Sequence, residues 1–375
     1  MTKLLAVFAT ALVLAYISEQ NTRATLAAGR PYVLIKDWAY VLLVVELTLF
    51  AGLRTSYNDT GNYINDFYSA PGINEWLSNP KSYNPFTNPL FYFYESLLKS
   101  LSGNPQILIF TSAFITQVCF LRFFKRYSEH FWFSIFIYFT LGTYVFSLAA
   151  IKQVLGMALV TLAFPCLEKR QWGRYYLIVL IAMLVHTYAL AFAFLPLFQT
   201  RPWSLFTFLF LSIIALVMLN FESAITAFME QANDLGKTLA EYEVFDDHTV
   251  NLFRLLVYAV PPVISFLFQK WVLRDSTPTQ NLLIHMSIIS LAFMSMGTQS
   301  GANMFGRMGN YFELGTVCCL PAMLSRTFNR RSYVFLSAVA CVCFFGFFFY
   351  ANAINLDFDR AYQSISLLEF LRSIF

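Results

Sequence analysis

Four basic residues of this 375-residue sequence lie at the ends of long apolar runs, apart from the basic clusters that separate the runs. They are Arg54, Lys152, Arg254 and Arg307. A cation at membrane depth costs about 3 kcal/mol on insertion scales and is usually paired, faces a cavity or acts on a substrate. Several cations that face one cavity would bind a polyanion such as a diphosphate, which guanidinium groups suit well. In the alternative interpretation, each cation reaches lipid headgroup phosphates or pairs with a nearby acid.

Two of these arginines have polar neighbours at helical spacing. Asn310 and Tyr311 follow Arg307 by three and four residues, and Tyr258 follows Arg254 by four. Residues three or four apart lie on the same face of a helix. We therefore predict that both arginines belong to polar stripes that can bind a substrate.

Two further ionisable residues are candidates for proton transfer. His186 lies in the middle of an apolar run, where an ionisable group is a functional candidate, although a lone histidine there can also be a hydrogen-bonded packing residue. Asp59 lies in "LRTSYNDTGNYINDFY", whose Tyr, Asn and Asp side chains suit sugar binding but equally suit a solvated loop. By contrast, Glu313 follows Arg307 by six residues, so it points elsewhere and has a structural interpretation.

Known motifs for metal or cofactor chemistry are missing from the sequence. It contains no HxxxH pair, acidic triplet, GxSxG, P-loop or zinc-type CxxC. We expect neither a metal nor a cofactor. Nucleic-acid binding is also not expected, because there is no basic run and no binding motif.

The elements that must position these residues are membrane helices. The sequence is 58% hydrophobic and 12% charged, and its apolar runs are long enough to cross about 30 Å of hydrocarbon at about 1.5 Å per residue. The prediction is an all-α polytopic integral membrane protein with about 10–11 transmembrane helices in a single membrane domain, residues 1–375. We expect the first run, 4–18, to be a retained helix and not a cleaved signal peptide.

Basic clusters between the runs set the orientation, because cytoplasmic loops are enriched in Lys and Arg. The clusters lie at 23–36, 122–126, 169–174, 270–274 and 326–331. Two large extracytoplasmic loops follow, 54–104 and 221–250. These assignments agree only if the apolar run 174–198 turns back near His186 as a re-entrant hairpin, which requires protein or water around the broken backbone.

The first of these loops contains an apolar-aromatic stretch, "NPLFYFYESLLKSL", which predicts a helix lying in the outer membrane interface. Its apolar face would contain Phe91, Tyr94, Leu98 and Leu101. Glu95 and Lys99, four residues apart, would lie on another face.

Several segments, in this order along the chain, together resemble the EpsG family of exopolysaccharide polymerases, relatives of the Wzy-type O-antigen and capsule polymerases. They are "GLRTSYNDTGNYINDFY", "NPLFYFYESLLKSLSGNPQILIFTSAF", "IKQVLGMAL", "EKRQWGRYYLIVLIAMLVHTYAL" and "FGRMGNYFELGTVCCLPAML". Lys152 of "IKQ" stands where the family commonly has Arg, so the cation is kept.

The resemblance implies a multi-pass protein of the cytoplasmic membrane that acts on undecaprenyl-diphosphate-linked oligosaccharides at the outer face. A growing chain would leave its lipid diphosphate and pass to a hydroxyl of the next repeat unit. A chain-length regulator is a further expected partner, besides the lipid bilayer. The catalytic candidates are then His186 or Asp59 as base and Arg307 on the diphosphate. The substrate-binding candidates are Arg54, Lys152, Gln153, Arg254, Tyr258, Asn310 and Tyr311.

Two other functions use similar groups. A flippase of lipid-linked sugars would bind the same diphosphate without breaking a bond, although the repeats common in transporters are not visible in this sequence. A ligase would transfer finished glycan to another acceptor with closely related chemistry.

Overall fold

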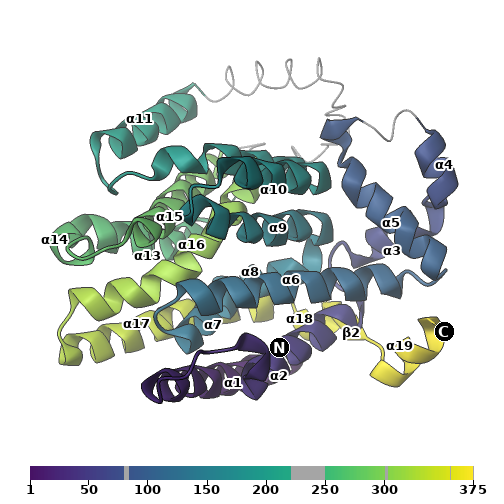
Figure 1. Ribbon diagram of the computed structural model, residues 1–375, viewed down its shortest axis with the longest axis horizontal. Helices are drawn as coiled ribbons and strands as arrows, with labels where there is room; N and C mark the ends of the chain where they lie inside the picture. The colour runs from purple at the N-terminus through teal and green to yellow at the C-terminus, as the bar shows by residue number, and fades with distance from the viewer. Residues whose placement is uncertain (80–83, 221–249, 300–302, 355, 375) are drawn as a thin grey trace. The chain divides into compact units, whose positions relative to one another are not determined.

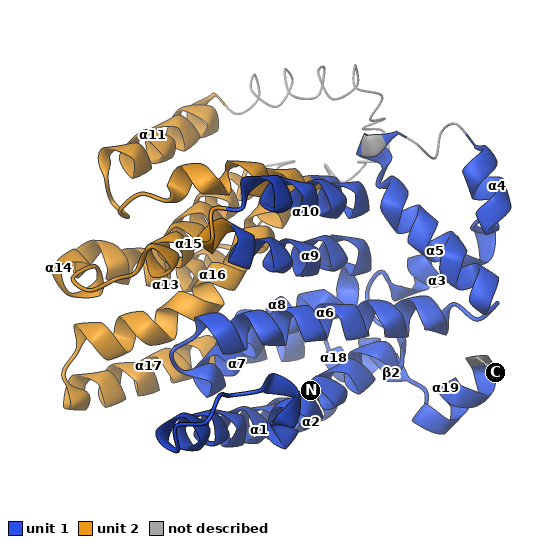
Figure 2. Ribbon diagram, in the orientation of Figure 1, with its two compact units in different colours: residues 1–166, 171–187, 348–375 blue, residues 167–170, 188–347 orange. Residues whose placement is uncertain are grey.

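The structure is a computed structural model, and it describes residues 1–79, 84–220, 250–299, 303–354 and 356–374 (Figure 1). Most of these residues are helical, which confirms the predicted all-α class. They form two compact units (Figure 2). Unit 1 contains residues 1–166, 171–187 and 348–375, and unit 2 contains residues 167–170 and 188–347. The single membrane domain stays a prediction.

Unit 1 contains the first half of the chain and its C-terminal end. Its long or apolar helices are α1 (Thr2–Ala27), α2 (Trp38–Gly52), α6 (Gln106–Tyr127), α7 (Phe131–Thr140), α8 (Thr143–Ala149), α9 (Ile151–Glu168) and α10 (Trp172–Val185). Its shorter elements are η1 (Leu34–Lys36), β1 (Arg54–Ser56), α3 (Thr60–Ser69), α4 (Ile73–Ser78), η3 (Pro85–Thr87), α5 (Pro89–Leu101), η6 (Tyr350–Ile354), α18 (Phe358–Ala361), β2 (Gln363–Ser364) and α19 (Leu367–Ile374). The last two residues of α9 already belong to unit 2.

Unit 2 contains the remaining helices. They are η4 (Thr187–Phe198), α11 (Leu205–Leu219), α13 (Leu252–Leu267), α14 (Gln269–Val272), α15 (Pro278–Met296), α16 (Asn303–Thr327) and α17 (Arg330–Phe349). Thr187 and the end of α17 belong to unit 1.

Local sequence sets several of these helix starts. The Asp37 carboxylate accepts a hydrogen bond from the backbone N–H of Tyr40 and caps α2. Asn251 caps α13 in the same way, and Thr277 begins α15 with a capping box. Such caps satisfy backbone donors that the first turn of a helix leaves unpaired.

Within the described residues, five helices are long and apolar enough to cross a membrane. They are α1, α6, α9, α15 and α17 continued to Ile354. The bent pair α7 and α8, which meet at 53°, provides a sixth candidate span, and Gly142 with φ +93° forms the bend. The shorter apolar helices are α2, α10, η4, α11 and α13. The long helix α16 is not among the candidate spans, because its polar residues lower its hydropathy. The polytopic membrane character is confirmed.

Contacts inside each unit agree with the predicted orientation. In unit 1, Lys125 Nζ lies 2.6 Å from Ser18 Oγ and 3.9 Å from Asp37 Oδ2, which brings the basic cluster 122–126 beside the C-terminal half of α1 and the start of α2. In unit 2, Thr279 donates to Glu168 over 3.0 Å, and Arg326 donates to Gln280 over 2.8 Å. The three basic clusters of unit 2 therefore gather at one end of their helices, as the positive-inside rule requires.

The run predicted as a re-entrant hairpin is broken at the expected residue. The α-helix α10 ends at Val185, and the 3₁₀-helix η4 follows His186. Gln199, just beyond η4, donates to the carbonyl of Leu167 over 3.5 Å. The turn of the chain back toward the start of α10 stays a prediction.

The two predicted outer loops have different outcomes. Loop 54–104 is largely helical, and the predicted interfacial helix is α5. Most of loop 221–250 lies outside the described residues. The sequence did not predict the antiparallel pair of β1 with β2, which joins Arg54 to Ser364.

The predicted faces of α5 are wrong in two places. Glu95 is 2% exposed and shares the buried face with Phe91 and Leu98, whereas Leu101 is exposed. Lys99 donates to the carbonyls of Tyr68 and Ala70 at the end of α3 and does not pair with Glu95. The reason is that α3, α4, α6 and α10 all contact α5, so that Glu95 is buried on a helix whose spacing suggested an exposed face.

Candidate functional site

Lys152 in unit 1 has only uncharged hydrogen-bond partners. It is the second residue of α9, and its backbone N–H donates to Tyr63 Oη over 3.2 Å. The side-chain Nζ donates to Tyr92 Oη over 3.0 Å and lies 4.6 Å from the centre of the Tyr92 ring and 5.1 Å from that of Phe91. In the part of the chain that the structure describes, no carboxylate forms an ion pair with Lys152. Its positive charge is therefore available to an anion.

A buried carboxyl group lies within electrostatic reach of this lysine. Glu95 Oε1 has no hydrogen-bond partner among the described residues. Burial raises the pKa of Glu95 to about 7, with a further increase from Asp66, while Lys152 and Lys99 act in the opposite direction. We refer to Tyr63, Tyr92, Glu95 and Lys152 as the lysine cluster.

An apolar core supports the lysine cluster. It consists of Phe67, Phe91, Leu98, Leu108, Ile109, Ile151, Leu155 and Val185. Burying one such side chain contributes about 1.5–3 kcal/mol, so the core fixes α3, α5, α6, α9 and α10 together. Ile151 directly precedes Lys152, and Val185 directly precedes His186. The core therefore places both predicted site residues at its edge.

His186 ends α10 in an extended conformation and is half-buried. The next residue, Thr187, donates its N–H to Asn88 Oδ1 over 3.0 Å and its hydroxyl to the Phe86 carbonyl over 3.2 Å. Asn88 directly precedes α5, the helix that contributes Tyr92 and Glu95 to the lysine cluster. Hydrogen bonds of Thr187 therefore connect the break at His186 to the start of α5. Gln153, beside Lys152 on α9, is buried.

Arg254 in unit 2 is part of a different network. Its Nη2 donates to Asn310 Oδ1 over 3.1 Å and to Tyr258 Oη at 3.4 Å, and its guanidinium lies 5.5 Å from the centre of the Tyr258 ring. The Tyr258 hydroxyl in turn donates to Glu313. We refer to Arg254, Tyr258, Asn310 and Glu313 as the arginine cluster. It joins the two predicted polar stripes, one on α13 and one on α16.

Glycines bring α16 close enough to α15 to fix its half of the arginine cluster. A Cβ on Gly309 would lie 3.1 Å from the Ser290 carbonyl oxygen, and one on Gly315 would lie 2.7 Å from that of Leu283. Small residues allow such close approach of membrane helices. The glycines of "FGRMGNYFELG" thus pack on α15, while Asn310 and Glu313 reach residues of α13.

Two other predicted residues of α16 have different surroundings. Tyr311 is fully buried, and the centre of its ring lies 6.3 Å from the centre of the Phe192 ring of η4. Arg307 is half-buried, two residues before Gly309. The predicted role of Arg307 on the diphosphate stays a prediction, as does a single cavity shared by all four cations.

Arg54 and Asp59 do not pair, although the sequence places them in one loop. Arg54 is 1% exposed, donates from Nε to Thr60 Oγ1 over 3.2 Å and donates from Nη1 to the Ala51 carbonyl. Burial lowers the pKa of Arg54 to about 10. The guanidinium thus links the end of α2 to the start of α3. Asp59 is half-buried at the position before α3 and makes no capping hydrogen bond.

Sequence reasoning missed Tyr63, Tyr92 and Glu95 as members of a site. The available signal was that Tyr92 and Glu95 are three residues apart in a predicted helix, and therefore on neighbouring positions of its surface. Among the described residues, no three His, Cys, Asp or Glu side chains come close enough together to hold a metal ion.

No curated protein and no solved structure matches the chain. A model of the EpsG family matches residues 37–365, which include both clusters and every predicted site residue. Because this match covers far more than half of the chain, the protein belongs to the EpsG family, which points to an enzyme that polymerises exopolysaccharide.

Proposed function

We propose that the protein joins oligosaccharide repeat units, carried on undecaprenyl diphosphate, into a surface polysaccharide at the outer face of the cytoplasmic membrane. The observation that carries this proposal is the ammonium group of Lys152, which has hydroxyl and ring partners but no carboxylate partner in the described residues. Such a group matches a diphosphate, and family membership supplies the polymerase activity.

In the proposed reaction, the bond between the anomeric carbon of the donor glycan and the diphosphate oxygen breaks. The oxygen keeps the electron pair, and the hydroxyl oxygen of the acceptor repeat forms the new glycosidic bond. Charge therefore develops on the diphosphate, where Lys152, Arg254 and Arg307 would stabilise it. Removing one such donor from a preorganised site typically slows a reaction by about 10²–10³-fold.

The acceptor hydroxyl must lose its proton to a base. His186 and Asp59 remain the candidates, and the geometry favours His186, because the core beside it also carries Lys152. Gln153, Asn310, Tyr258 and Tyr311 would position the sugars and the diphosphate. Arg54 would help to bind the substrate from its position just beyond the end of α2. A chain-length regulator would act as a partner protein.

Lys152→Met tests the proposal, because it removes the charge and keeps an unbranched side chain. We expect the surface glycan to lose its long ladder on a gel and to retain a single-repeat product. Lys152→Arg should keep most of the ladder. Lys169→Met is the matched control, since Lys169 is an exposed lysine just beyond the other end of α9.

The pattern on the gel separates the possible outcomes. Complete loss of surface repeats would indicate a flippase and would overturn the polymerase proposal. An unchanged ladder in Lys152→Met, with normal protein in the membrane, would overturn the role of Lys152.

A further inference from the structure

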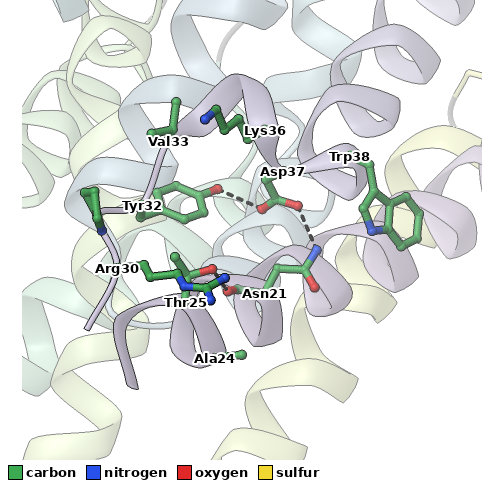
Figure 3. A pocket seen from close by; sticks show the side chains of 10 residues that line it. Asn21, Ala24, Thr25, Arg30, Tyr32, Val33, Lys36, Asp37 and Trp38 are labelled. Carbon is green, nitrogen blue, oxygen red and sulfur yellow. Dashed lines mark hydrogen bonds between the residues drawn. The ribbon is translucent and has the colours of Figure 1, made fainter. Parts of the chain in front are cut away.

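A pocket of about 550 Å³ lies in unit 1 where α1 ends and α2 begins (Figure 3). Its lining includes Asn21, Thr25, Arg30, Tyr32, Lys36 and Trp38. Pockets of about 300–1,000 Å³ are typical of small-ligand sites. The positive-inside rule assigns this end of the helices to the cytoplasm, opposite to the proposed reaction.

Two cations of the pocket lack an acidic partner. The side chains of Arg30 and Lys36 are exposed, and neither forms an ion pair with any acid that the structure describes. In Figure 3, Arg30 lies beside Asn21 and Thr25, and Lys36 lies on the other side of Tyr32. The two charges therefore flank the pocket.

The acid in the pocket wall, Asp37, already has hydrogen-bond and ion-pair partners within the protein. Its Oδ2 accepts from Tyr32 and Ser18, each over 2.7 Å, its Oδ1 accepts from Asn21 over 2.9 Å, and Lys125 Nζ lies 3.9 Å away. Burial alone would raise the pKa of Asp37, but these hydrogen bonds and the lysine charge hold it below its usual value. The pocket therefore has a positive excess that suits an anion.

The rim of the pocket is apolar and exposed. Val33 and Trp38, which both line the pocket, are 39% and 56% exposed. Tryptophan is enriched where membrane proteins meet the headgroup region. A soluble phosphate compound would use the cations but would leave these apolar side chains in water, whereas a lipid would cover them.

We propose that this pocket binds the phosphate of an anionic phospholipid in the cytoplasmic leaflet. Arg30 and Lys36 hold the phosphate oxygens from two sides, and the exposed side chains of Val33 and Trp38 contact the glycerol and the first part of the acyl chains. This site is separate from the proposed polymerase reaction and does not depend on it.

The test uses the full-length protein in neutral detergent and measures phospholipid binding by native mass spectrometry. The probes are phosphatidylglycerol, zwitterionic phosphatidylcholine and inorganic phosphate. The test variant is Arg30→Gln with Lys36→Gln. The matched control is Arg330→Gln with Arg331→Gln, which removes two exposed cations from the end of α17 that the positive-inside rule assigns to the cytoplasm.

We expect phosphatidylglycerol to bind the unaltered protein more tightly than phosphatidylcholine. Each basic residue near an anionic lipid strengthens binding by about fivefold in the dissociation constant. The test variant, which lacks two such residues, should therefore bind phosphatidylglycerol about thirtyfold more weakly. The control variant should bind it within about twofold of the unaltered protein. Both variants should unfold at the same temperature without lipid, because all four side chains are exposed.

If the test and control variants lost the same phosphatidylglycerol affinity, the proposal that the lipid binds in this pocket would be wrong. Displacement of phosphatidylglycerol by millimolar inorganic phosphate, with equal stabilisation by phosphate alone, would overturn the lipid as the source of the phosphate group. Unchanged binding in the test variant would overturn the proposal altogether.

Discussion

In the lysine cluster, the cation of Lys152 is surrounded by phenol hydroxyls and ring faces, whereas in the arginine cluster Arg254 is connected through Tyr258 to the carboxylate of Glu313. Charges interact more strongly in a low-dielectric interior than in water. The carboxylate of Glu313 therefore offsets part of the charge of Arg254 and fixes its orientation. We infer that Lys152 contributes mainly charge and that Arg254 contributes mainly geometry.

Exchanging the two kinds of cation should have the largest effect on activity. Arg254→Lys keeps the charge but removes the planar group whose Nη2 reaches both Asn310 and Tyr258. We expect about 10²-fold less polymer, equivalent to about 2.7 kcal/mol of transition-state stabilisation, in membranes supplied with lipid-linked repeats. Lys152→Arg should lower the amount of polymer by less than about tenfold, because it retains the positive charge.

Equal losses in Arg254→Lys and Lys152→Arg would contradict the assignment of charge to one cluster and geometry to the other. The amount of each protein in the membrane, measured by immunoblot, provides the control for folding.

The buried acids of the two clusters also differ, because the Glu95 carboxyl group makes no side-chain hydrogen bond within the described residues whereas Glu313 Oε2 accepts from Tyr258. The pKa of Glu95 is about 7 in the folded protein, against an ordinary value of 4.5. The folded state therefore binds this proton more tightly, and its stability falls as pH rises from about 4.5 to about 7. The loss amounts to about 3 kcal/mol.

Glu95→Gln should remove this pH dependence and stabilise the protein at pH 8. Thermal unfolding in detergent between pH 5 and pH 8 measures the effect. Glu75→Gln, at an exposed position of the neighbouring helix α4, provides the matched control and should leave the slope unchanged. A slope that persists in Glu95→Gln would assign the pH dependence to another group.

The helices that carry the clusters should respond to added methyl groups in opposite directions. A Cβ on Gly315 of α16 would lie 2.4 Å from Met286 Cβ, so Gly315→Ala should destabilise the protein by about 1–3 kcal/mol. A Cβ on Gly61 of α3 would meet open space. Gly61→Ala should therefore stabilise it by about 0.5–1 kcal/mol through helix propensity. Shifts of the same sign in the unfolding temperature would contradict this difference in packing.

The sequence predicted the parts of this architecture that depend on local periodicity. The predicted apolar runs are helical, and the predicted break lies at His186. Asn310 and Tyr258 lie on the expected helix faces, because a spacing of three or four residues determines which side chains share a face. Which helix a face meets is a tertiary property. For that reason, the sequence did not show that Asn310 of α16 would bind Arg254 of α13.

Long-range contacts and unexpected burial explain the parts that were missed. β1 pairs with β2 across about 300 residues, and no local pattern encodes that partner. Glu95 and Lys99 have the spacing of a surface ion pair, which predicts an exposed face. In the structure Glu95 is buried, and Lys99 donates to a carbonyl at the end of α3. Packing between helices, and not the spacing of the two residues, therefore determines their partners.

The smallest expected effect isolates one hydroxyl of the lysine cluster. Tyr92→Phe removes the hydrogen bond from Lys152 Nζ, 3.0 Å long, but keeps the ring at 4.6 Å. A net hydrogen bond contributes about 1 kcal/mol, so polymer yield should fall by no more than about fivefold. Tyr92→Ala also removes the ring and should cost about 0.5–1 kcal/mol more. If Tyr92→Phe lost as much polymer as Lys152→Met, the hydroxyl itself would contact the substrate, and Lys152 would serve to orient it.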